Sequence, residues 1–542
     1  MRNMVISHFF CNFAPRNQTF LLIPDMAKVI KLRKGLDVNL KGKATKETAT
    51  VSCPGEYALV PDDFYGVKPK VVVKEGDAVK AGDALFVDKL HPEVKFVSPV
   101  SGTVSMVERG DRRKLLSIRV KADEKQEARQ FDTKGDLKAL MMESGLFAFL
   151  RQRPYDVVAN PDDAPKAIFV SAFNSMPLSQ DFEYVLQGQE AEFQAGLTAL
   201  AKLAKVYLGV SAKQTAKALT EAKDCEVNIF DGPAPAGNVG VQINHVNPIN
   251  KGEVVWTLGA EEVIFLGRLL KTGKVDFTRT IALAGSEVKA PKYYKVKVGQ
   301  KLSTLLSGTI NAEGARIISG NVMTGLKTSA EGSLGAHATE VNVIPEGDHA
   351  DEMLGWIMPR FNTFSTHRSY FSWLNNNKKR TNNGNDNKFI AGLLAFLFGS
   401  IGLQNFYLGK ITKGVLCLLF CWTGIPTLIG FIEGIIIWNK SDEEFKKSLE
   451  REPKEYVIDA RVKGGERHMI MSGEYDKVFP MDIYAGYLVK AIIAGDIDRQ
   501  EALGIYEVAP EDFAIAEFVD SSKLELQRIV REGLDILRKE NA

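Results

Sequence analysis

The sequence predicts a multidomain chain of α/β and α+β modules, with a transmembrane helical hairpin inserted towards its C-terminal end. Three observations lead to this fold class. Short β-branched runs separated by Gly-Asp and Ser-Gly fill the N-terminal part, strand-like and helix-like segments alternate in the middle, and two long stretches almost free of charge follow residue 388. With 542 residues the chain exceeds what one hydrophobic core supports, so several domains are expected.

The first 25 residues differ in character from the rest of the chain. Residues 1–25 carry one early arginine, and their apolar run is interrupted by Pro15, Arg16 and Asn17. No unbroken apolar segment leads to a small-residue cleavage site, which argues against a signal peptide. The segment that begins at Met26, MAKVIKLRKGLDVNLKG, is typical of the start of a folded domain. We therefore expect Met26 to be the native start and residues 1–25 to be a disordered extension or a misassigned start.

Residues 26–125 predict a small β domain of the barrel-sandwich type. Between Val71 and Val107 the apolar runs are too short for helices and are separated by Gly-Asp and Ser-Gly turns. The pattern is similar to the domains that carry biotin or lipoate on a lysine at a hairpin tip. Lys89 lies near that place, but its hairpin is longer than in a lipoyl domain and its flanks are not those of a biotin site. We interpret Lys89 as an ordinary hairpin residue and keep a carrier function as an alternative.

Residues 126–279 predict a Rossmann-like α/β domain. Compact apolar segments typical of buried strands alternate there with segments of helical periodicity, with strands at 166–173, 206–212 and 226–232 and helices at 190–205 and 214–223. This alternation favours a parallel sheet with covering helices.

A Gly-rich segment, residues 231–256, comes after the last of these strands. Its glycines at 232, 237 and 240 do not match G-x-G-x-x-G, and it contains no Gly-Lys-Ser/Thr, so neither a dinucleotide fingerprint nor a Walker loop is indicated. We expect an extended loop leading to a strand. The alternative is a ligand-contacting loop, because long irregular loops beside a parallel sheet often carry function.

Residues 280–374 predict a β-grasp domain of the soluble-ligand-binding type and a connection. Strands are expected in RTIALAG, APKYYKVKVGQ and GARIISG, with a short helix in KLSTLLSG. The segment 319–325, SGNVMTG, is rich in turn residues, and its backbone amides could face a ligand or a partner.

Residues 375–450 predict an inserted membrane hairpin. Two apolar stretches, 389–409 and 414–438, come after a polar linker, and each is long enough to cross a hydrocarbon layer of about 30 Å. Pro426 should kink the second span. Basic residues are more frequent in the flanks than in the connecting loop, which places both ends in the cytoplasm. We expect contact with membrane lipid through residues 389–438.

The hairpin resembles a family of small two-helix transmembrane domains marked by G-x-x-G, FYLG and an acidic residue in the second helix. Gly399, Gly402 and the FYLG of 406–409 match this pattern, and Glu433, the only charge of the second stretch, takes the acidic position. An ionisable group within a span suggests a function, and Glu433 could reach the interface or a polar partner. The resemblance implies a topology and no particular chemistry.

Composition excludes several classes of function. The net charge of +2, without an aromatic-basic stripe, gives no indication of nucleic-acid binding. The five cysteines form no C-x-x-C pair, so a zinc site, a dithiol centre and a four-cysteine iron–sulfur cluster are unsupported. We therefore expect no metal site and no self-contained catalytic site on this chain.

Residues 451–542 are predicted to be helical, and with several earlier segments they carry a family resemblance. The chain resembles the family of A subunits of the Na⁺-translocating NADH:quinone reductases (NqrA). The matching segments are IKLRKGLDVNLKG, VDKLHPEVKFVSPVSG, INHVNPINKGEVVW, GNVMTG, KGGERHMIMS and DKVFPMDIY. The membrane hairpin is foreign to that family, so residues 375–450 are interpreted as an insertion.

The resemblance implies a peripheral cytoplasmic subunit of a six-subunit complex in the bacterial inner membrane, which oxidises NADH, reduces quinone to quinol and exports Na⁺. The flavins and the NAD site would lie on other subunits, with this subunit serving the quinone step. Quinone recognition needs an apolar channel and one or two donors. Gly237, Gly240 and His245 are the candidate quinone-proximal residues, although a neutral histidine that merely caps a strand is the more common explanation for His245. The same explanation applies to His337, His367 and His468, and a membrane-tethered scaffold without substrate contact is the other alternative.

Overall fold

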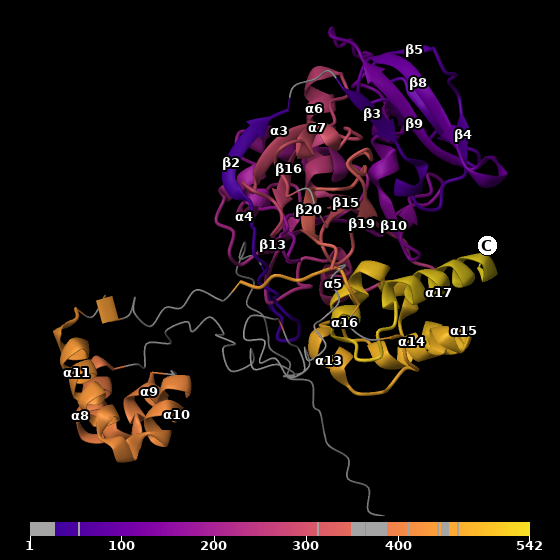
Figure 1. Ribbon diagram of the computed structural model, residues 1–542. Helices are drawn as coiled ribbons and strands as arrows, with labels where there is room; N and C mark the ends of the chain where they lie inside the picture. The colour runs from indigo at the N-terminus through magenta and orange to yellow at the C-terminus, as the bar shows by residue number, and fades with distance from the viewer. Residues whose placement is uncertain are drawn as a thin grey trace, which may run out of the picture.

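The computed structural model shows, in its described part, four β-sheets with helices among their strands, a C-terminal group of helices and a separate group in the insertion (Figure 1). That part comprises residues 28–51, 55–311, 314–347, 364, 387–408, 411–441, 444–445, 455–462 and 465–541. The expectation for residues 1–25 and most of the linkers around the predicted hairpin therefore lie outside the described residues.

The N-terminal barrel-sandwich is confirmed and consists of two small antiparallel sheets. The four-stranded sheet contains β3 (Glu56–Leu59), β9 (Leu115–Ala122), β8 (Gly102–Arg109) and β5 (Ala78–Val79), and the three-stranded sheet contains β4 (Pro69–Val71), β6 (Ala84–Asp88) and β7 (Lys95–Val97). Their shared core includes Phe86 stacked on Phe96 with ring centroids 4.4 Å apart. Gly82 has the positive φ of +94° that the predicted turn requires. Lys89 is exposed just after β6.

The α/β domain contains a seven-stranded sheet in the order β1-β14-β13-β12-β15-β10-β11. The five strands from β1 to β15 are parallel, as predicted, whereas β10 pairs antiparallel with both β15 and β11. Its strands are β1 (Lys28–Lys31), β12 (Ala167–Ser171), β13 (Val206–Ser211), β14 (Glu226–Asp231), β15 (Val255–Gly259), β10 (Arg151–Arg153) and β11 (Val157–Val158). Its helices are α1 (Leu137–Ser144), α2 (Phe182–Val185), α3 (Glu190–Leu200), α4 (Lys217–Thr220), α5 (Val239–Val246) and α6 (Ala260–Thr272). Glycines allow α3 and α6 to pack closely, since a Cβ on Gly267 would lie 1.8 Å from the Glu192 carbonyl oxygen.

The expected extended loop over 231–256 is wrong for its middle part, which forms α5. Val239, Ile243 and Val246 recur at the i, i+4, i+7 spacing of a helix and pack against Phe169 and Tyr207 of the sheet. The prolines at 233, 235 and 248 flank this helix and do not interrupt it.

A six-stranded mixed sheet comes next along the chain, in the order β19-β18-β20-β16-β17-β2. Its elements are β16 (Thr278–Ala284), β17 (Lys292–Lys297), β18 (Ala315–Ser319), β19 (Leu326–Thr328), β20 (Glu340–Pro345), β2 (Thr45–Thr50) and the predicted short helix α7 (Ser303–Leu306). Two strands of the predicted 26–125 domain therefore belong elsewhere. β1 pairs with β14 of the α/β sheet, and β2 pairs with β17. Such pairings depend on distant partners that local sequence does not reveal.

The C-terminal region is helical, as predicted, with α13 (Glu474–Val478), α14 (Ala485–Ile493), α15 (Ile497–Ala502), α16 (Ala514–Val519) and α17 (Leu526–Glu540). Phe479 and Phe513 lie in one hydrophobic cluster with Phe230 of β14, so these helices pack directly on the α/β domain (Figure 1). A short 3₁₀ helix, η8 (Pro510–Phe513), brings acidic side chains to this boundary.

The insertion contains four α-helices, α8 (Lys388–Phe398), α9 (Leu403–Tyr407), α10 (Ile411–Leu419) and α11 (Ile425–Asn439), among the residues described there. None of the helices in the described residues combines the length and apolar character needed to traverse a bilayer. The two predicted continuous spans are broken at Gly402 and Gly424, whose φ values of +69° and +73° end the preceding helical turns. Pro426 does not kink a span, because it lies in the first turn of α11, where proline is tolerated.

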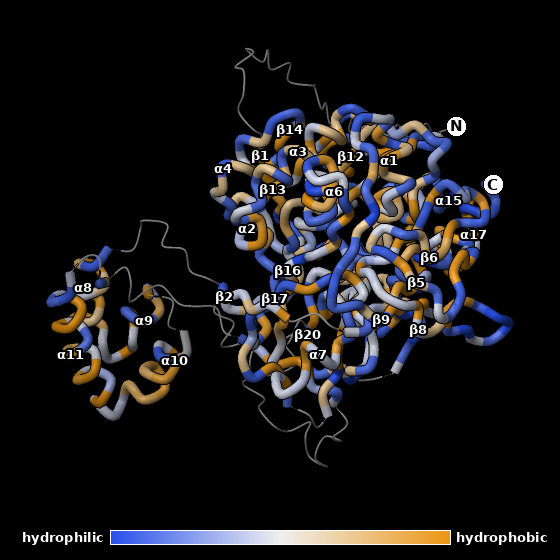
Figure 2. Tube along the Cα trace, turned by 90° about the horizontal axis from the view of Figure 1, so that it is seen from above, coloured by the Kyte–Doolittle hydropathy of each residue, from blue (hydrophilic) through white to orange (hydrophobic). Residues whose placement is uncertain are grey.

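The insertion has an inverted distribution of side chains. Figure 2 shows apolar residues along α8, α10 and α11, and Phe389, Leu397, Trp422 and Leu428 are each more than 60% exposed. Gln404 and Asn405 are buried, and Gln404 Nε2 donates to Glu433 Oε2 at 3.2 Å. Glu433 thus faces a polar partner, which is one of the two roles expected for it.

Candidate functional site

The candidate site lies where the α/β sheet changes its winding direction. β12 and β15 are parallel neighbours, but the chain leaves β12 towards β13 on one side and returns to β15 on the other. In open α/β sheets, ligands bind in the crevice outside the carboxyl ends of two such strands. A hollow of about 260 Å³, here named the inner cavity, occupies this place between residues 171–174 after β12 and residues 257–262 around the end of β15.

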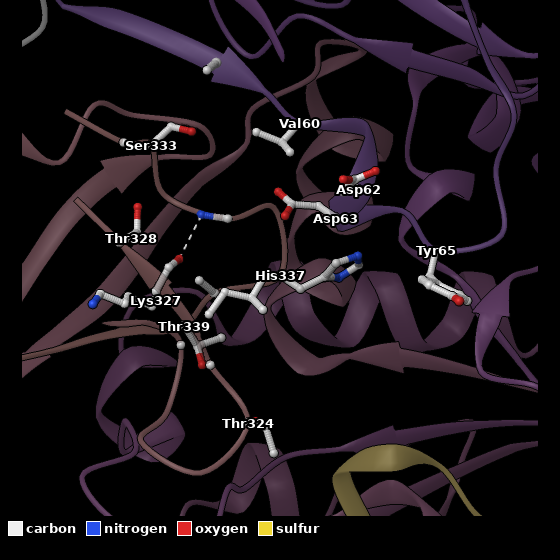
Figure 3. A pocket seen from close by; sticks show the side chains of 18 of the residues that line it. Val60, Asp62, Asp63, Tyr65, Thr324, Lys327, Thr328, Ser333, His337 and Thr339 are labelled. Atoms are coloured by element: carbon white, nitrogen blue, oxygen red, sulfur yellow. Dashed lines mark hydrogen bonds between the residues drawn. The ribbon is translucent and has the colours of Figure 1, made fainter. Parts of the chain in front are cut away.

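A larger hollow of about 730 Å³, here named the outer cavity, adjoins the first (Figure 3). It is lined by residues of the barrel-sandwich, the six-stranded sheet and the C-terminal helices. The 319–325 turn contributes to it, and this turn is fixed by Asn321, whose Oδ1 accepts from the backbone N–H of Met323 and Thr324. The two cavities share lining residues, namely Arg151, Asp156, Asn174, Asn321, Thr324, His337, Thr339 and Glu511.

His337 lies at the junction of the two cavities. Its ring contacts Phe64 and Phe149 edge to face, with centroids 5.7 and 5.4 Å apart. Burial, together with the charges of Arg151 and Arg279, lowers the pKa of His337 well below its ordinary value, so the imidazole is neutral at pH 7. Its nitrogens make no hydrogen bond to any described residue, and Figure 3 shows the ring on the side of Asp63 and Tyr65. A neutral donor and acceptor is thus available to a ligand.

Asp63 closes one wall of the outer cavity. Its Oδ2 accepts from the Ala336 backbone N–H at 2.7 Å, immediately before His337. Burial raises the pKa of Asp63 to about 6, so part of the population is protonated near neutral pH. Asp63 therefore fixes the loop that carries His337 and adds a second group able to exchange protons.

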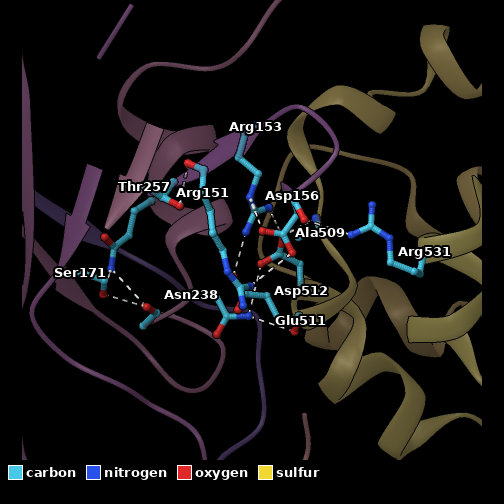
Figure 4. A network of polar contacts seen from close by, with 12 residues as sticks. Arg151, Arg153, Asp156, Ser171, Asn238, Thr257, Ala509, Glu511, Asp512 and Arg531 are labelled. Atoms are coloured by element: carbon cyan, nitrogen blue, oxygen red, sulfur yellow. Dashed lines mark hydrogen bonds and ion pairs between the residues drawn. The ribbon is translucent and has the colours of Figure 1, made fainter. Parts of the chain in front are cut away.

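A network of charged side chains connects the site to the C-terminal helices (Figure 4). Arg153 on β10 is 1% exposed, and its Nη2 donates to Glu511 Oε1 at 2.9 Å. Its Nε lies 3.5 Å from Asp156 Oδ1. Arg531 of α17 donates to the backbone carbonyls of Tyr155 and Asp156. Burial would raise the pKa of Asp156, but Arg153 and its neighbouring arginines outweigh it and hold that pKa below its ordinary value.

Two glutamates in the first turn of α6 border the inner cavity. Arg279 Nη2 donates to Glu262 Oε1 at 2.6 Å, and Arg279 Nε lies 3.3 Å from Glu261 Oε2. All three side chains are at least 95% buried. One guanidinium thus faces two carboxylates in a place from which water is largely excluded.

The residues predicted to lie near quinone are separated in the structure. Gly237 lines the inner cavity, and its carbonyl accepts from Ser171 Oγ at 2.8 Å. Gly240 lies against Asp512, whose Oδ2 would be 2.3 Å from a Cβ there. His245 is in the last turn of α5 with Nδ1 2.9 Å from the Val241 carbonyl oxygen, so it caps no strand and does not line either cavity.

The other candidates lie elsewhere. His468 is exposed, and its carbonyl accepts from Ser522 Oγ at 3.1 Å. His367 lies outside the described residues. Lys89 lines neither cavity, and its backbone N–H donates to the Lys68 carbonyl at 2.9 Å. Among the described residues, no group of three or more His, Cys, Asp or Glu side chains could hold a metal ion.

Sequence reasoning missed most of the charged residues of the site. Arg151, Arg153 and Asp156 occur in the run RQRPYD directly after a buried apolar segment, and Glu261 and Glu262 come soon after the strand VVWTL. For Glu261 and Glu262 the available signal was their position directly after a buried strand, because strand ends meet at one edge of the sheet. Arg151 and Arg153 lie on the strand β10 itself, and this signal does not mark them.

Comparison with family models divides the chain into matched segments. Residues 30–123 match the NqrA N-terminal barrel-sandwich hybrid domain, residues 133–275 the NqrA second alpha/beta domain, and residues 280–330 the NQRA C-terminal domain. Residues 384–435 match the TM2 domain, which agrees with the FYLG pattern of the insertion.

Curated relatives match along nearly the whole chain. The A subunit of the Na(+)-translocating NADH-quinone reductase of Pasteurella multocida (strain Pm70) is 31% identical over 524 residues, covering 94% of this chain and 100% of the relative. The corresponding protein of Yersinia pestis bv. Antiqua (strain Angola) is 31% identical, and that of Haemophilus influenzae (strain PittGG) is 30% identical, with the same coverage. A solved NAD+-reducing [NiFe]-hydrogenase in the H2-reduced state is 12% identical with a TM-score of 0.29, over 59% of this chain and 64% of that one, and contributes nothing to the argument.

Proposed function

The chain belongs to the family of A subunits of the Na⁺-translocating NADH-quinone reductases, and we propose from this premise that it is the peripheral cytoplasmic subunit that serves the quinone step. The complex would contain six subunits at the bacterial inner membrane, oxidise NADH, reduce quinone to quinol and export Na⁺. Flavins and the NAD site would lie on the other subunits. The membrane association of such a complex and the TM2 match of the insertion support this placement.

Quinone would bind in the inner cavity, with its flat head group at the junction where His337 lies. A quinone ring is uncharged and apolar and carries two carbonyl oxygens that accept hydrogen bonds. Recognition therefore needs aromatic or apolar walls and a few neutral donors. Phe149 and Phe173 supply apolar walls, and His337 and Asn174 supply neutral donors.

The single observation that carries this proposal is the position of His337. Its imidazole is neutral, is held between two phenylalanine rings, and makes no hydrogen bond within the described part of the chain. A half-buried ring nitrogen without a protein partner costs free energy unless water or a ligand completes its hydrogen bond. A ligand carbonyl at the junction would accept that bond.

Binding of a short-chain benzoquinone to the purified chain tests the proposal. His337→Gln should weaken binding about tenfold, because one buried hydrogen bond of about 1.4 kcal/mol loses its geometry. His245→Gln is the matched control, since that histidine lines neither cavity, and it should leave the dissociation constant unchanged. Calorimetric titration measures both. If the wild-type chain binds no benzoquinone, the scaffold alternative replaces the quinone role.

We further propose that the insertion contacts lipid through residues 389–438, with both of its ends on the cytoplasmic side. Its exposed side chains are large and apolar while Gln404, Asn405 and several glycines are inside. In water this arrangement is unfavourable, because exposed apolar area costs roughly 25 cal/mol per Å². In hydrocarbon it is favourable, since small residues allow close helix packing and polar groups pair internally. The helices would rearrange or lie within the lipid, and either way the insertion tethers the soluble body.

A further inference from the structure

Glu261 is a buried carboxyl group whose surroundings supply no well-formed hydrogen bond. Both of its side-chain oxygens are buried, and neither makes a hydrogen bond of normal geometry to the described residues. Its one close charge is Arg279, whose Nε lies 3.3 Å from Glu261 Oε2. A buried carboxylate without good hydrogen bonds is costly, and such a group commonly takes up a proton instead.

Arg279 forms its hydrogen bonds with partners other than Glu261. Its Nη2 donates to Glu262 Oε1 at 2.6 Å, and its Nη1 donates to the Ala338 carbonyl at 2.8 Å. The guanidinium therefore neutralises Glu262 and at the same time fixes the residue next to His337. One cation cannot balance two buried carboxylates, so the second carboxyl group, Glu261, is the one that carries a proton.

Glu261 borders the same cavity as His337. Both residues line the inner cavity, Glu261 from the first turn of α6 and His337 from the loop before β20. The outer cavity, which also reaches His337, opens a route for water from the surface. A protonated carboxyl group, a neutral imidazole and access to water are thus combined around one space.

We propose that Glu261 donates a proton to the quinone that is reduced in this cavity. This inference rests on the proposed function. Reduction of a quinone consumes two electrons, which NADH supplies through the complex, and two protons. The O–H bond of Glu261 breaks as an O–H bond forms on one reduced carbonyl oxygen, and the second proton comes from water in the outer cavity. Arg279 then faces both carboxylates until water protonates Glu261 again.

Electrostatics agree with this role. Burial raises the pKa of Glu261 to about 7, which is where a group that both gives and regains a proton works best. Arg279 from β16 opposes this shift most strongly, and Glu262 of the same helix turn adds to it. The Thr280 backbone N–H and Arg268 oppose it more weakly. The other charged or titratable groups around the cavity are Arg151, Arg153, Asp156, His337 and Glu511.

The test uses the assembled complex and the purified chain together. Glu261→Gln keeps the size of the side chain and cannot donate this proton, so NADH-driven quinone reduction should fall about 100-fold in kcat. The limb of the pH profile near pH 7 should disappear, while the affinity of the purified chain for a short-chain benzoquinone stays within about twofold. Glu261→Asp should retain the pH limb with a smaller loss of kcat, which shows that the acid and not the packing matters.

Two results would overturn the inference, and they are distinguishable. If the purified wild-type chain binds no benzoquinone, the quinone role and the proton role both fail. If it binds quinone but the Glu261→Gln complex keeps its kcat and its pH limb, only the proton role fails. If Glu261→Gln and Glu261→Asp both lose benzoquinone binding as well as kcat, Glu261 is a packing residue. That result would also overturn the proposal.

Discussion

The Nη1 atom of Arg153 lies 3.6 Å from Oδ2 of Asp512, and this buried pair joins the α/β domain to the C-terminal helices. The two residues are separated by more than 350 positions in the sequence, yet both are at most 1% exposed. Burial raises the pKa of Asp512 to about 6, and Arg153 opposes that rise. One arginine shared by several carboxylates thus adds a buried ionic contact to the hydrophobic packing between the α/β domain and the C-terminal helices.

Arg153→Met should strongly destabilise the chain. Removing the guanidinium leaves Glu511 and the buried Asp512 near one another without their cation, at a cost of about 3–5 kcal/mol, while Asp156 keeps Arg151 beside it. The midpoint of urea unfolding, followed by a probe in the C-terminal helices, measures this. Arg499→Met, which removes an exposed pair with Asp496, is the control and should cost under about 0.5 kcal/mol. Equal midpoints for the two variants would contradict the prediction.

Asp63 should make the chain less stable as the pH rises from about 4 to 6. The folded state raises the pKa of Asp63 from 3.8 to about 6, so it binds the proton more tightly than the unfolded state does. The stabilising contribution is complete below about pH 4 and is lost as the pH passes the folded pKa. Asp63→Asn should therefore match the wild type at about pH 3.5 and exceed its melting temperature at about pH 7. A variant with a lower melting temperature at neutral pH would refute this sign.

Glu346 should make the chain more stable as the pH rises, the opposite of the effect expected for Asp63. Hydrogen bonds from Arg316, and then from Lys327, lower the pKa of Glu346 to about 2. Its contribution is therefore present above about pH 4.5 and disappears as the pH falls towards 2. Glu346→Gln should cost about 1 kcal/mol at about pH 7 and much less at about pH 2, where about half of the Glu346 carboxyl groups are protonated. The same thermal scans measure it, and a loss that persists in acid would show that packing, not charge, is responsible.

Gly102→Ala should destabilise the barrel-sandwich. A Cβ at this position would lie 2.0 Å from the Lys121 carbonyl oxygen on the neighbouring strand β9, and backbone cannot move aside as a side chain can. We expect a loss of about 2 kcal/mol. Gly135→Ala is the matched control, because a Cβ there meets nothing within 4 Å. Calorimetry of both variants would contradict the prediction if their melting temperatures were the same.

Deleting residues 375–450 should leave the rest of the chain folded and remove the proposed affinity for lipid. The sheets and the C-terminal helices share their cores without a contribution from α8–α11, which form a small cluster of their own. Co-flotation with vesicles of phosphatidylethanolamine and phosphatidylglycerol compares the trimmed and full-length chains. Flotation of the trimmed chain to the same extent would mean that another surface holds the lipid.

The sequence was sufficient for the parts of the fold that depend on local patterns. Buried strands at 167–171 and 206–211, the helix at 190–200 and the turns of the barrel-sandwich result from periodicity and from glycine placement. The helix α5 was missed because prolines and glycines on both sides obscured an i, i+4, i+7 pattern of only eight residues. The breaks at Gly402 and Gly424 were missed because the apolar character of a long stretch does not change where one helix ends and the next begins.

The candidate site was only partly predictable, because it is assembled from distant segments. Gly237 lines the inner cavity, whereas His245, named with it as quinone-proximal, does not. His337 was one of several candidate histidines, and only the structure distinguishes it, by placing Phe64 and Phe149 beside its ring. Glu261 becomes a candidate proton donor only when the structure shows that Arg279 pairs with Glu262. Long-range neighbours of this kind are set by topology, which a single sequence does not contain.

The strand β1 completes an edge of the α/β sheet by pairing Lys28 with Asn228, about 200 residues further along the chain. During synthesis at about 5–20 residues per second, this segment leaves the ribosome at least about 10 s before its partner exists. The interval is longer still for β2, whose partner residues are Lys292–Lys295 of β17. The nascent N-terminus therefore spends that interval as an unpaired β-forming segment, and we expect it to depend on chaperones until the later strands emerge.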